Sequence, residues 1–220
     1  MRVIAGEYRS RVLRAPEGLD NTSHDAKGGR VGDPVTTPHH AKGGRVGGPV
    51  TRPTSDRLRE TLFNVLAPRV EGSVFLDLYA GSGAVGIEAL SRGALEAIFV
   101  EQAEPALRAI RGNLASLGIR GHYALEARSV AAGLRRLAEA ERKADLIFLD
   151  PPYAQADEYG LALGLLGGAC GGVLTGEAWV IAEHEKRREL EERYGKLARF
   201  RVLKQGDAAL SFYRVAVESE

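Results

Sequence analysis

The stretch DLYAGSGAVG, residues 77–86, says most about the fold, because it ends one apolar run and opens a helical pattern. The apolar run VFLDL at residues 74–78 predicts a buried strand. Three glycines follow, Gly81, Gly83 and Gly86. Because glycine has no side chain, it permits positive φ angles and lets a ligand lie against bare backbone. In open α/β sheets, ligands bind beyond the carboxyl ends of the strands, where such a turn lies. The stretch therefore predicts an α/β fold with a ligand site at this turn.

Apolar runs alternate with helical patterns from residue 73 to the end of the chain. Strands are expected near residues 74–78, 97–100, 122–125, 146–149, 178–182, 200–203 and 210–215. Helices are expected near residues 52–66, 84–91, 105–117, 129–140, 157–166 and 186–193, with Pro68 ending the first. This alternation predicts a doubly wound, Rossmann-like sheet of seven mostly parallel strands, the last two forming an antiparallel hairpin at one edge.

Three parts are expected along the chain. Residues 1–20 contain short β-rich runs and predict a small β-hairpin extension. Residues 22–51 are a tandem duplication, in which TSHDAKGGRVGDPVT is followed by TPHHAKGGRVGGPVT with 12 of 15 positions identical. Because this Gly- and Pro-rich stretch has little to bury, residues 21–51 are expected to form a flexible surface insert. Residues 52–220 are expected to form the catalytic domain.

The composition is that of a globular protein. The 220 residues are 44% hydrophobic and 27% charged, which suffices for one sizeable core. The chain has no long uncharged apolar run and its first residues lack the apolar block of a signal peptide, so a cytoplasmic protein without a membrane span is expected. Cys170 is the only cysteine, so neither an internal disulfide nor a Cys-x-x-Cys site is possible, and no metal is expected.

Positive charge is concentrated at the front of the chain, although the net charge is only +1. Residues 1–69 carry 12 Lys and Arg against 7 Asp and Glu, whereas residues 70–220 carry 18 against 22. A polyanion would therefore meet the N-terminal part. Arg2, Arg9 and Arg11, with Arg14 close by, are the candidate contacts to nucleic-acid phosphates.

Two carboxylates help to identify the ligand of the glycine turn. Glu101 follows Gly81 by twenty residues, at the end of the next expected strand, where a carboxylate can accept hydrogen bonds from ribose hydroxyls. This spacing fits either a nicotinamide dinucleotide or another adenosine ligand. Asp77 lies just before the glycines, where it would repel a pyrophosphate and attract an ammonium or a sulfonium. Asp77 therefore favours S-adenosylmethionine.

The tetrad Asp150-Pro151-Pro152-Tyr153 ends the fourth expected strand, at the same edge of the sheet. A carboxylate and a fixed carbonyl can accept both hydrogens of a planar amine, and the Tyr153 ring can stack on the base. Two acceptors pulling on the amine favour a pyramidal nitrogen and free its lone pair for attack on a methyl sulfonium. The tetrad thus predicts an amino-methyltransferase, with Asp150 as the group that orients and activates the amine.

Four stretches together resemble the bacterial family of 16S ribosomal RNA guanine-N2 methyltransferases. They are RVIAGEYRSRVLRAPEG (2–18), TRPTSDRLRETLFNVLAP (51–68), FLDLYAGSGAVGIEALSRGA (75–94) and LIFLDPPY (146–153). The resemblance implies a Rossmann-like methyltransferase fold with an N-terminal hairpin that helps to hold RNA. It also implies methyl transfer from S-adenosylmethionine to the exocyclic amine of one guanine, flipped from its stem-loop. The insert at 21–50 departs from the family, which is normally much shorter there.

The motifs assign candidate residues to each part of the site. The resemblance implies that the glycine turn surrounds the methionine part of the cofactor, Glu101 holds the ribose and residues 126–127 border the adenine. The cofactor candidates are Asp77, Tyr79, Ala80, Gly81, Ser82, Gly83, Gly86, Glu101, Gln102, Glu126, Ala127, Arg52 and Thr54. The target-base candidates are Asp150, Pro151, Pro152 and Tyr153.

Several alternatives remain open on the sequence alone. A related tetrad serves methyltransferases that act on DNA adenine or on protein glutamine. The glycine spacing alone also fits an NAD-dependent dehydrogenase, and a non-catalytic RNA binder of ribosome assembly is a third class. The expected partner is 16S rRNA or a 30S assembly particle, and the expected state is a monomer.

Overall fold

The computed structural model describes residues 1–16, 53–152 and 157–216. The predictions for the insert at 21–51, for Arg52 and for Tyr153 lie outside these residues, as does the side chain of Thr54. Within the described residues, no helix is both long and apolar enough to span a membrane.

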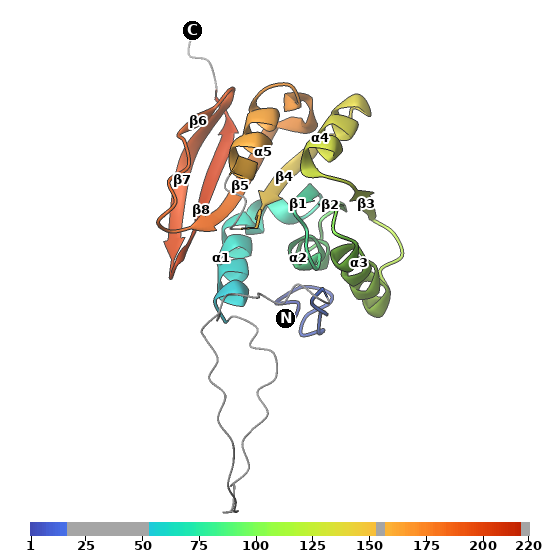
Figure 1. The fold of residues 1–220 in the computed structure, drawn as a ribbon. Helices are drawn as coiled ribbons and strands as arrows, with labels where there is room; N and C mark the ends of the chain where they lie inside the picture. The colour runs from blue at the N-terminus through green and yellow to red at the C-terminus, as the bar shows by residue number, and fades with distance from the viewer. Residues whose placement is uncertain (17–52, 153–156, 217–220) are drawn as a thin grey trace, which may run out of the picture.

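Strands and helices alternate through the chain as the sequence predicts (Figure 1). The strands are β1 (Val74–Leu78), β2 (Glu96–Glu101), β3 (Tyr123–Ala127), β4 (Ala144–Leu149), β5 (Leu174–Glu185), β6 (Arg193–Tyr194), β7 (Leu197–Gln205) and β8 (Ala208–Val215). The helices are α1 (Pro53–Val70), α2 (Ala84–Ser91), α3 (Glu104–Leu117), α4 (Val130–Glu139) and α5 (Asp157–Gly167), with a 3-10 turn at Gly171–Val173.

The strands form one sheet in the order β3-β2-β1-β4-β5-β8-β7-β6. Strands β1 to β5 run parallel, and β8, β7 and β6 add antiparallel pairs beyond β5. The prediction of a mostly parallel sheet with an antiparallel edge is confirmed, but the described sheet has eight strands rather than seven. The additional strand, β6, pairs only two residues with β7, and this is too short to produce an apolar alternation in the sequence.

Helices cover both faces of the sheet (Figure 1). Helices α4 and α5 pack on one face over Ile147 and Val180 of the central strands. On the other face, α1 packs over Phe148 and Ile181, and α2 and α3 pack over Phe99. Side chains of one strand alternate between these two cores, as the two-residue period of a strand requires. This alternation decides which polar residues at the strand ends point to the same side.

The helix boundaries follow local signals in the sequence. The Ser129 hydroxyl accepts a hydrogen bond from the Ala132 amide at the start of α4, as a helix-capping serine does. Gly118 ends α3 in the left-handed conformation, with φ 73°, so the helix stops at Leu117 as the predicted range 105–117 requires. The prediction that Pro68 ends the first helix is wrong, because α1 continues to Val70. A proline near the end of a helix breaks few backbone hydrogen bonds, and Val70 gains burial in the core.

The helix predicted at residues 186–193 is absent from the described structure. The Lys186 amide donates to the Asp207 carbonyl, and the Arg188 amide donates to the Glu185 carbonyl, which makes a turn at the end of β5. Leu190 is the large apolar residue of this segment and is buried. A single apolar residue gives a helix no stripe to bury, so contacts to β8 and to the core decide the conformation.

The N-terminal segment 1–16 folds back on itself, but it forms only the isolated bridge Arg2↔Val12 rather than two regular strands. Its pairing continues through the hydrogen bond from the Val3 amide to the Arg11 carbonyl. The buried Glu88 carboxylate of α2 accepts the Ile4 amide at 2.7 Å and the Ala5 amide at 3.0 Å. One glutamate thus anchors the segment to the domain.

Replacing Glu88 with alanine should release the N-terminal segment from α2. The change leaves two backbone amides without an acceptor and removes the ion pair with Arg92, at a cost of about 2–4 kcal/mol. Hydrogen exchange read by mass spectrometry should show faster exchange of the amides at 4–8, with β1 still protected. The exposed Glu60→Ala serves as the control. Unchanged exchange at 4–8 in Glu88→Ala would contradict this role.

Candidate active site

A cavity of about 1670 Å³ lies at the carboxyl ends of the parallel strands. Its walls include Tyr79 and Gly81 after β1, Glu101 and Gln102 at the end of β2, and Asp150 and Pro151 after β4. The two sequence motifs, which are separated by about seventy residues of chain, therefore line one space. This is the position at which open α/β sheets bind ligands.

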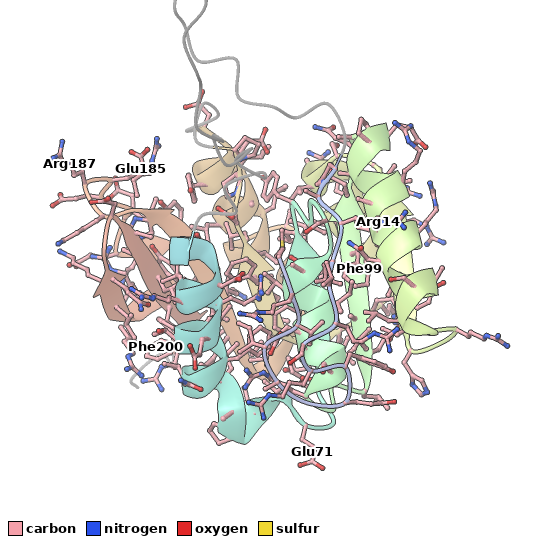
Figure 2. The ribbon with its side chains drawn as sticks, turned by 90° about the horizontal axis from the view of Figure 1, so that it is seen from below. Arg14, Glu71, Phe99, Glu185, Arg187 and Phe200 are labelled. Atoms are coloured by element: carbon pink, nitrogen blue, oxygen red, sulfur yellow. The ribbon has the colours of Figure 1, made fainter. Side chains whose placement is uncertain are left out.

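The glycine turn depends on unusual backbone angles and on one close contact. Gly81 and Gly83 have φ angles of 56° and 76°, and Tyr79, directly after β1, is itself left-handed with φ 60°. A Cβ on Gly86 would lie 2.3 Å from Cε1 of Phe99, which occupies the interior between sheet and helices (Figure 2). The first two glycines thus shape the turn, and the third lets α2 pack closely on β2.

Asp77 is buried beneath the turn and does not line the cavity in the described structure. Its Oδ2 accepts the Gly86 amide at 2.9 Å, so this carboxylate fixes the start of α2. Burial, together with the charges of Asp150 and Glu101, raises the pKa of Asp77 to about 8. The hydrogen bond from Gly86 opposes this shift. That Asp77 faces a cationic ligand remains a prediction, since the residue lies beneath the turn rather than in the lining.

The Glu101 carboxylate joins β2 to the glycine turn. Its Oε2 accepts the Gly81 amide at 2.9 Å, and its Oε1 accepts the amides of Gln102 and Ala103, each at 2.8 Å. A carboxylate offers about four acceptor positions, so one remains for a hydroxyl in the cavity. Glu101 therefore holds the turn in shape while still facing the ligand space.

Asp150 follows the last residue of β4 and faces the cavity together with Pro151 and Pro152. Burial raises the pKa of the Asp150 carboxyl. No described residue donates a hydrogen bond to this carboxylate, so its acceptors are available to a ligand. Pro151 is buried and Pro152 exposed, which fits a rigid turn that leaves the strand. The prediction that this corner shares the pocket with the glycine turn agrees with the structure; its catalytic role is a proposal.

Glu183 is a candidate that was not predicted from the sequence. It lies in β5 next to the end of β4 and lines the same cavity. Burial raises the pKa of Glu183, and the neighbouring Asp150 raises it further, while Arg59 of α1 lowers it. A signal was present, since Glu183 directly follows the apolar run 178–182, just as Asp150 follows its own run.

Other predicted residues lie close to the cavity without lining it. Glu126 and Ala127 end β3, and Glu126 forms an ion pair with Arg128 at 2.8 Å. The lining on this side comes instead from the next four residues, 128–131. The remaining turn residues outside the lining are Ala80, Ser82, Gly83 and Gly86.

Two groups of exposed cationic side chains bear on the binding of a polyanion. The predicted phosphate contacts Arg2, Arg9, Arg11 and Arg14 are all exposed on the N-terminal segment, away from the cavity lining. A second group, which was not predicted from the sequence, is exposed at the cavity rim and consists of Lys186, Arg187 and Lys204. Figure 2 shows Arg187 and Arg14 on well-separated parts of the surface.

Comparisons with known proteins agree with this architecture. The family model described as "Conserved hypothetical protein 95" matches residues 45–214. "Putative rRNA methyltransferase YlbH" of Bacillus subtilis (strain 168) is 34% identical over an alignment of 223 residues that covers 97% of this chain and 98% of that protein. "Ribosomal RNA small subunit methyltransferase D" of Escherichia coli (strain K12) is 32% identical over 153 residues, or 70% of this chain and 60% of that one.

A solved structure of similar shape is that of "Putative methyltransferase yhhF" from Escherichia coli. It superposes with a TM-score of 0.70 at 27% identity, and the match covers 99% of each chain. The N-terminal segment and the antiparallel end of the sheet are thus included in the likeness.

Asp77→Asn should make the free energy of unfolding less sensitive to a rise in pH. The pKa of Asp77 is about 8 in the folded protein, above the ordinary value of 3.8, so the folded state holds this proton more tightly than the unfolded state. The stability that the proton contributes is fully present below about pH 4 and is lost as the pH rises through about 8. Between pH 5.5 and 8.5, wild type should lose on the order of 3 kcal/mol more unfolding free energy than Asp77→Asn, as measured by urea unfolding. The exposed Asp207→Asn should decline in parallel with wild type. If the unfolding free energy of Asp77→Asn declines as steeply as that of wild type, the raised pKa does not belong to Asp77.

Proposed function

The chain belongs to the family described as Conserved hypothetical protein 95, and from this premise we propose that it methylates the exocyclic N2 amine of one guanine in 16S ribosomal RNA with S-adenosylmethionine. The observation that carries the proposal is the common cavity of the Asp150–Pro152 corner and the glycine turn. An amine held at that corner lies in the same space as a ligand of Gly81 and Glu101.

The residues present fit S-adenosylmethionine. Gly81 has no atom nearer than 3.9 Å to the position of a Cβ, so its backbone is open to a ligand. Glu101 has one acceptor position left for a ribose hydroxyl. Asp150 lines the cavity and Asp77 lies beneath the turn, and a bound sulfonium or ammonium would favour the ionised form of both carboxyls. The cavity exceeds the usual ligand pocket of about 300–1,000 Å³, which leaves room for a cofactor and a purine base.

The corner at the end of β4 prepares the amine for attack. S-adenosylmethionine supplies a methyl group on a cationic sulfur that leaves as a neutral thioether. Asp150 and the Pro151 carbonyl accept the two amine hydrogens, which directs the nitrogen lone pair toward the methyl carbon. When the amine is methylated, Asp150 would take the proton that the nitrogen loses and pass it to water. Tyr153 is proposed to stack on the base.

The substrate RNA is proposed to dock across the exposed arginines of the N-terminal segment. These are Arg2, Arg9, Arg11 and Arg14, and Glu88 fixes the segment that carries them. The Escherichia coli relative is named for ribosomal RNA of the small subunit, which supports 16S rRNA, free or in a 30S assembly particle, as the proposed partner. We propose that the protein acts as a monomer in the cytoplasm.

The alternatives raised from the sequence differ in their products. A DNA adenine or protein glutamine methyltransferase would leave rRNA unchanged, and a non-catalytic assembly factor would tolerate Asp150→Ala. Only the glycine spacing favours the alternative of an NAD-dependent dehydrogenase. Thermal-shift measurements with NAD and with S-adenosylmethionine distinguish the two cofactors. The decisive test is nucleoside mass spectrometry of rRNA from cells that lack the protein, which should lose one N2-methylguanosine.

Asp150→Asn should slow methyl transfer strongly while the protein still binds RNA. The amide cannot take the proton from the amine, and general-base catalysis contributes about 10²–10⁴-fold to rate. Turnover measured with tritiated S-adenosylmethionine should fall at least about 100-fold, with RNA affinity within about threefold of wild type. Asp157→Asn, an exposed change at the start of α5, is the matched control. Retained turnover in Asp150→Asn would exclude Asp150 as the base.

Neutralising Arg9 and Arg14 together should weaken RNA binding and its salt dependence. Each phosphate contact contributes close to one unit of slope when log affinity is plotted against log salt concentration, so the double alanine variant should lose about two units. Filter binding between about 50 and 200 mM salt measures the slope. Arg135 and Arg136 on α4, on the opposite face of the sheet, provide the control pair. An equal loss of slope in the control pair would argue against the N-terminal segment as the docking surface.

A further inference from the structure

The neighbour of Asp150 in the cavity is Glu183. Strands β4 and β5 run parallel with Leu149 opposite Ala182, so Asp150 and Glu183 occupy equivalent places, each one residue further along its chain. Adjacent strands lie about 4.8 Å apart, so the two residues are next to each other.

The two carboxylates also share a face of the sheet. Phe148 and Ile181, two residues earlier in each strand, pack in the core beneath α1. By the alternation of a strand, Asp150 and Glu183 lie on the same side, and both line the cavity. Asp77 lies on this side as well. It is opposite Phe148 in the register, so it lies at a level two residues before Asp150 along the strand direction. Asp77 is already hydrogen-bonded to Gly86, which leaves Asp150 and Glu183 as the pair that faces the cavity.

Among the described residues, none donates a hydrogen bond to either carboxylate of the pair. Arg59 attracts Glu183, but its Nη2 donates to Asp56 at 3.1 Å and to the Arg2 carbonyl. Asp150 and Glu183 are half-buried and line the cavity, so their acceptors are open to donors supplied by a ligand. The ligand that fits this corner therefore presents two neighbouring N–H groups.

Guanine has such an edge, since its N1–H is adjacent to the N2 amine. Adenine presents an acceptor at N1, which a carboxylate repels. Building on the proposed function, we propose that Glu183 accepts the N1–H of the target guanine while Asp150 accepts an N2 hydrogen. Glu183 is then the residue that selects guanine over adenine and over other purines that lack the N1–H.

The test compares guanine with 2-aminopurine, which keeps the amine but replaces the N1–H by an acceptor. Single-turnover kcat/KM is measured on rRNA carrying either base at the methylated position. A site built around a hydrogen bond rejects an analogue that lacks the donor, so wild type should favour guanine by at least about 100-fold. In Glu183→Gln, the amide can donate to N1 of 2-aminopurine, and the preference should fall at least about tenfold.

Glu177→Gln is the control, because it makes the same change in the same strand, is exposed and lies outside the cavity lining. It should keep the wild-type preference. A wild type that methylates both bases equally, or a Glu183→Gln with unchanged preference, overturns the inference while leaving guanine methylation intact. A wild type that leaves guanine unmethylated overturns the proposed function itself.

A second variant covers the case in which Glu183→Gln fails to fold, as judged by thermal unfolding. Glu183→Asp keeps the charge but retracts the acceptor by one methylene. Its kcat/KM on guanine should fall at least about tenfold, with 2-aminopurine still rejected and S-adenosylhomocysteine affinity within about threefold of wild type. Wild-type rates on guanine in Glu183→Asp overturn the inference.

Discussion

The parallel register of β1, β4 and β5 sets the geometry of the site. It places Asp77 opposite Phe148 and Phe148 opposite Ile181, so the polar residues that follow these strands gather at one edge and on one face. Backbone hydrogen bonds hold the strands at fixed spacing, which brings carboxylates together at a place where they repel one another. The hydrophobic cores on both faces offset this repulsion.

Four of the acidic groups at this edge divide into two kinds. Asp77 and Glu101 accept backbone amides of the glycine turn and give the turn its shape. Asp150 and Glu183 have no such partners among the described residues and face the cavity, so they are free to act on a ligand. A site of this kind uses some carboxylates as scaffold and reserves others for the substrate.

The N-terminal segment depends on the same helix that the glycine turn begins. The turn opens α2, and α2 presents Glu88 to the amides of Ile4 and Ala5. Gly6 lies so close to α2 that a Cβ there would collide with the Ser91 carbonyl. The proposed RNA-docking arginines and the proposed cofactor site are therefore positioned by one element, which fixes the distance between them.

Neighbouring residues encode the strand–helix alternation, the glycine turn and the Asp150 corner, so each of these could be predicted from the sequence. The turn at residues 186–193 could not, since it depends on a hydrogen bond to the distant Asp207. Nor did local pattern reveal the partnership of Asp150 with Glu183. These residues are far apart in the chain and meet only when β4 and β5 pair, so the assembled sheet determines which carboxylates share the cavity.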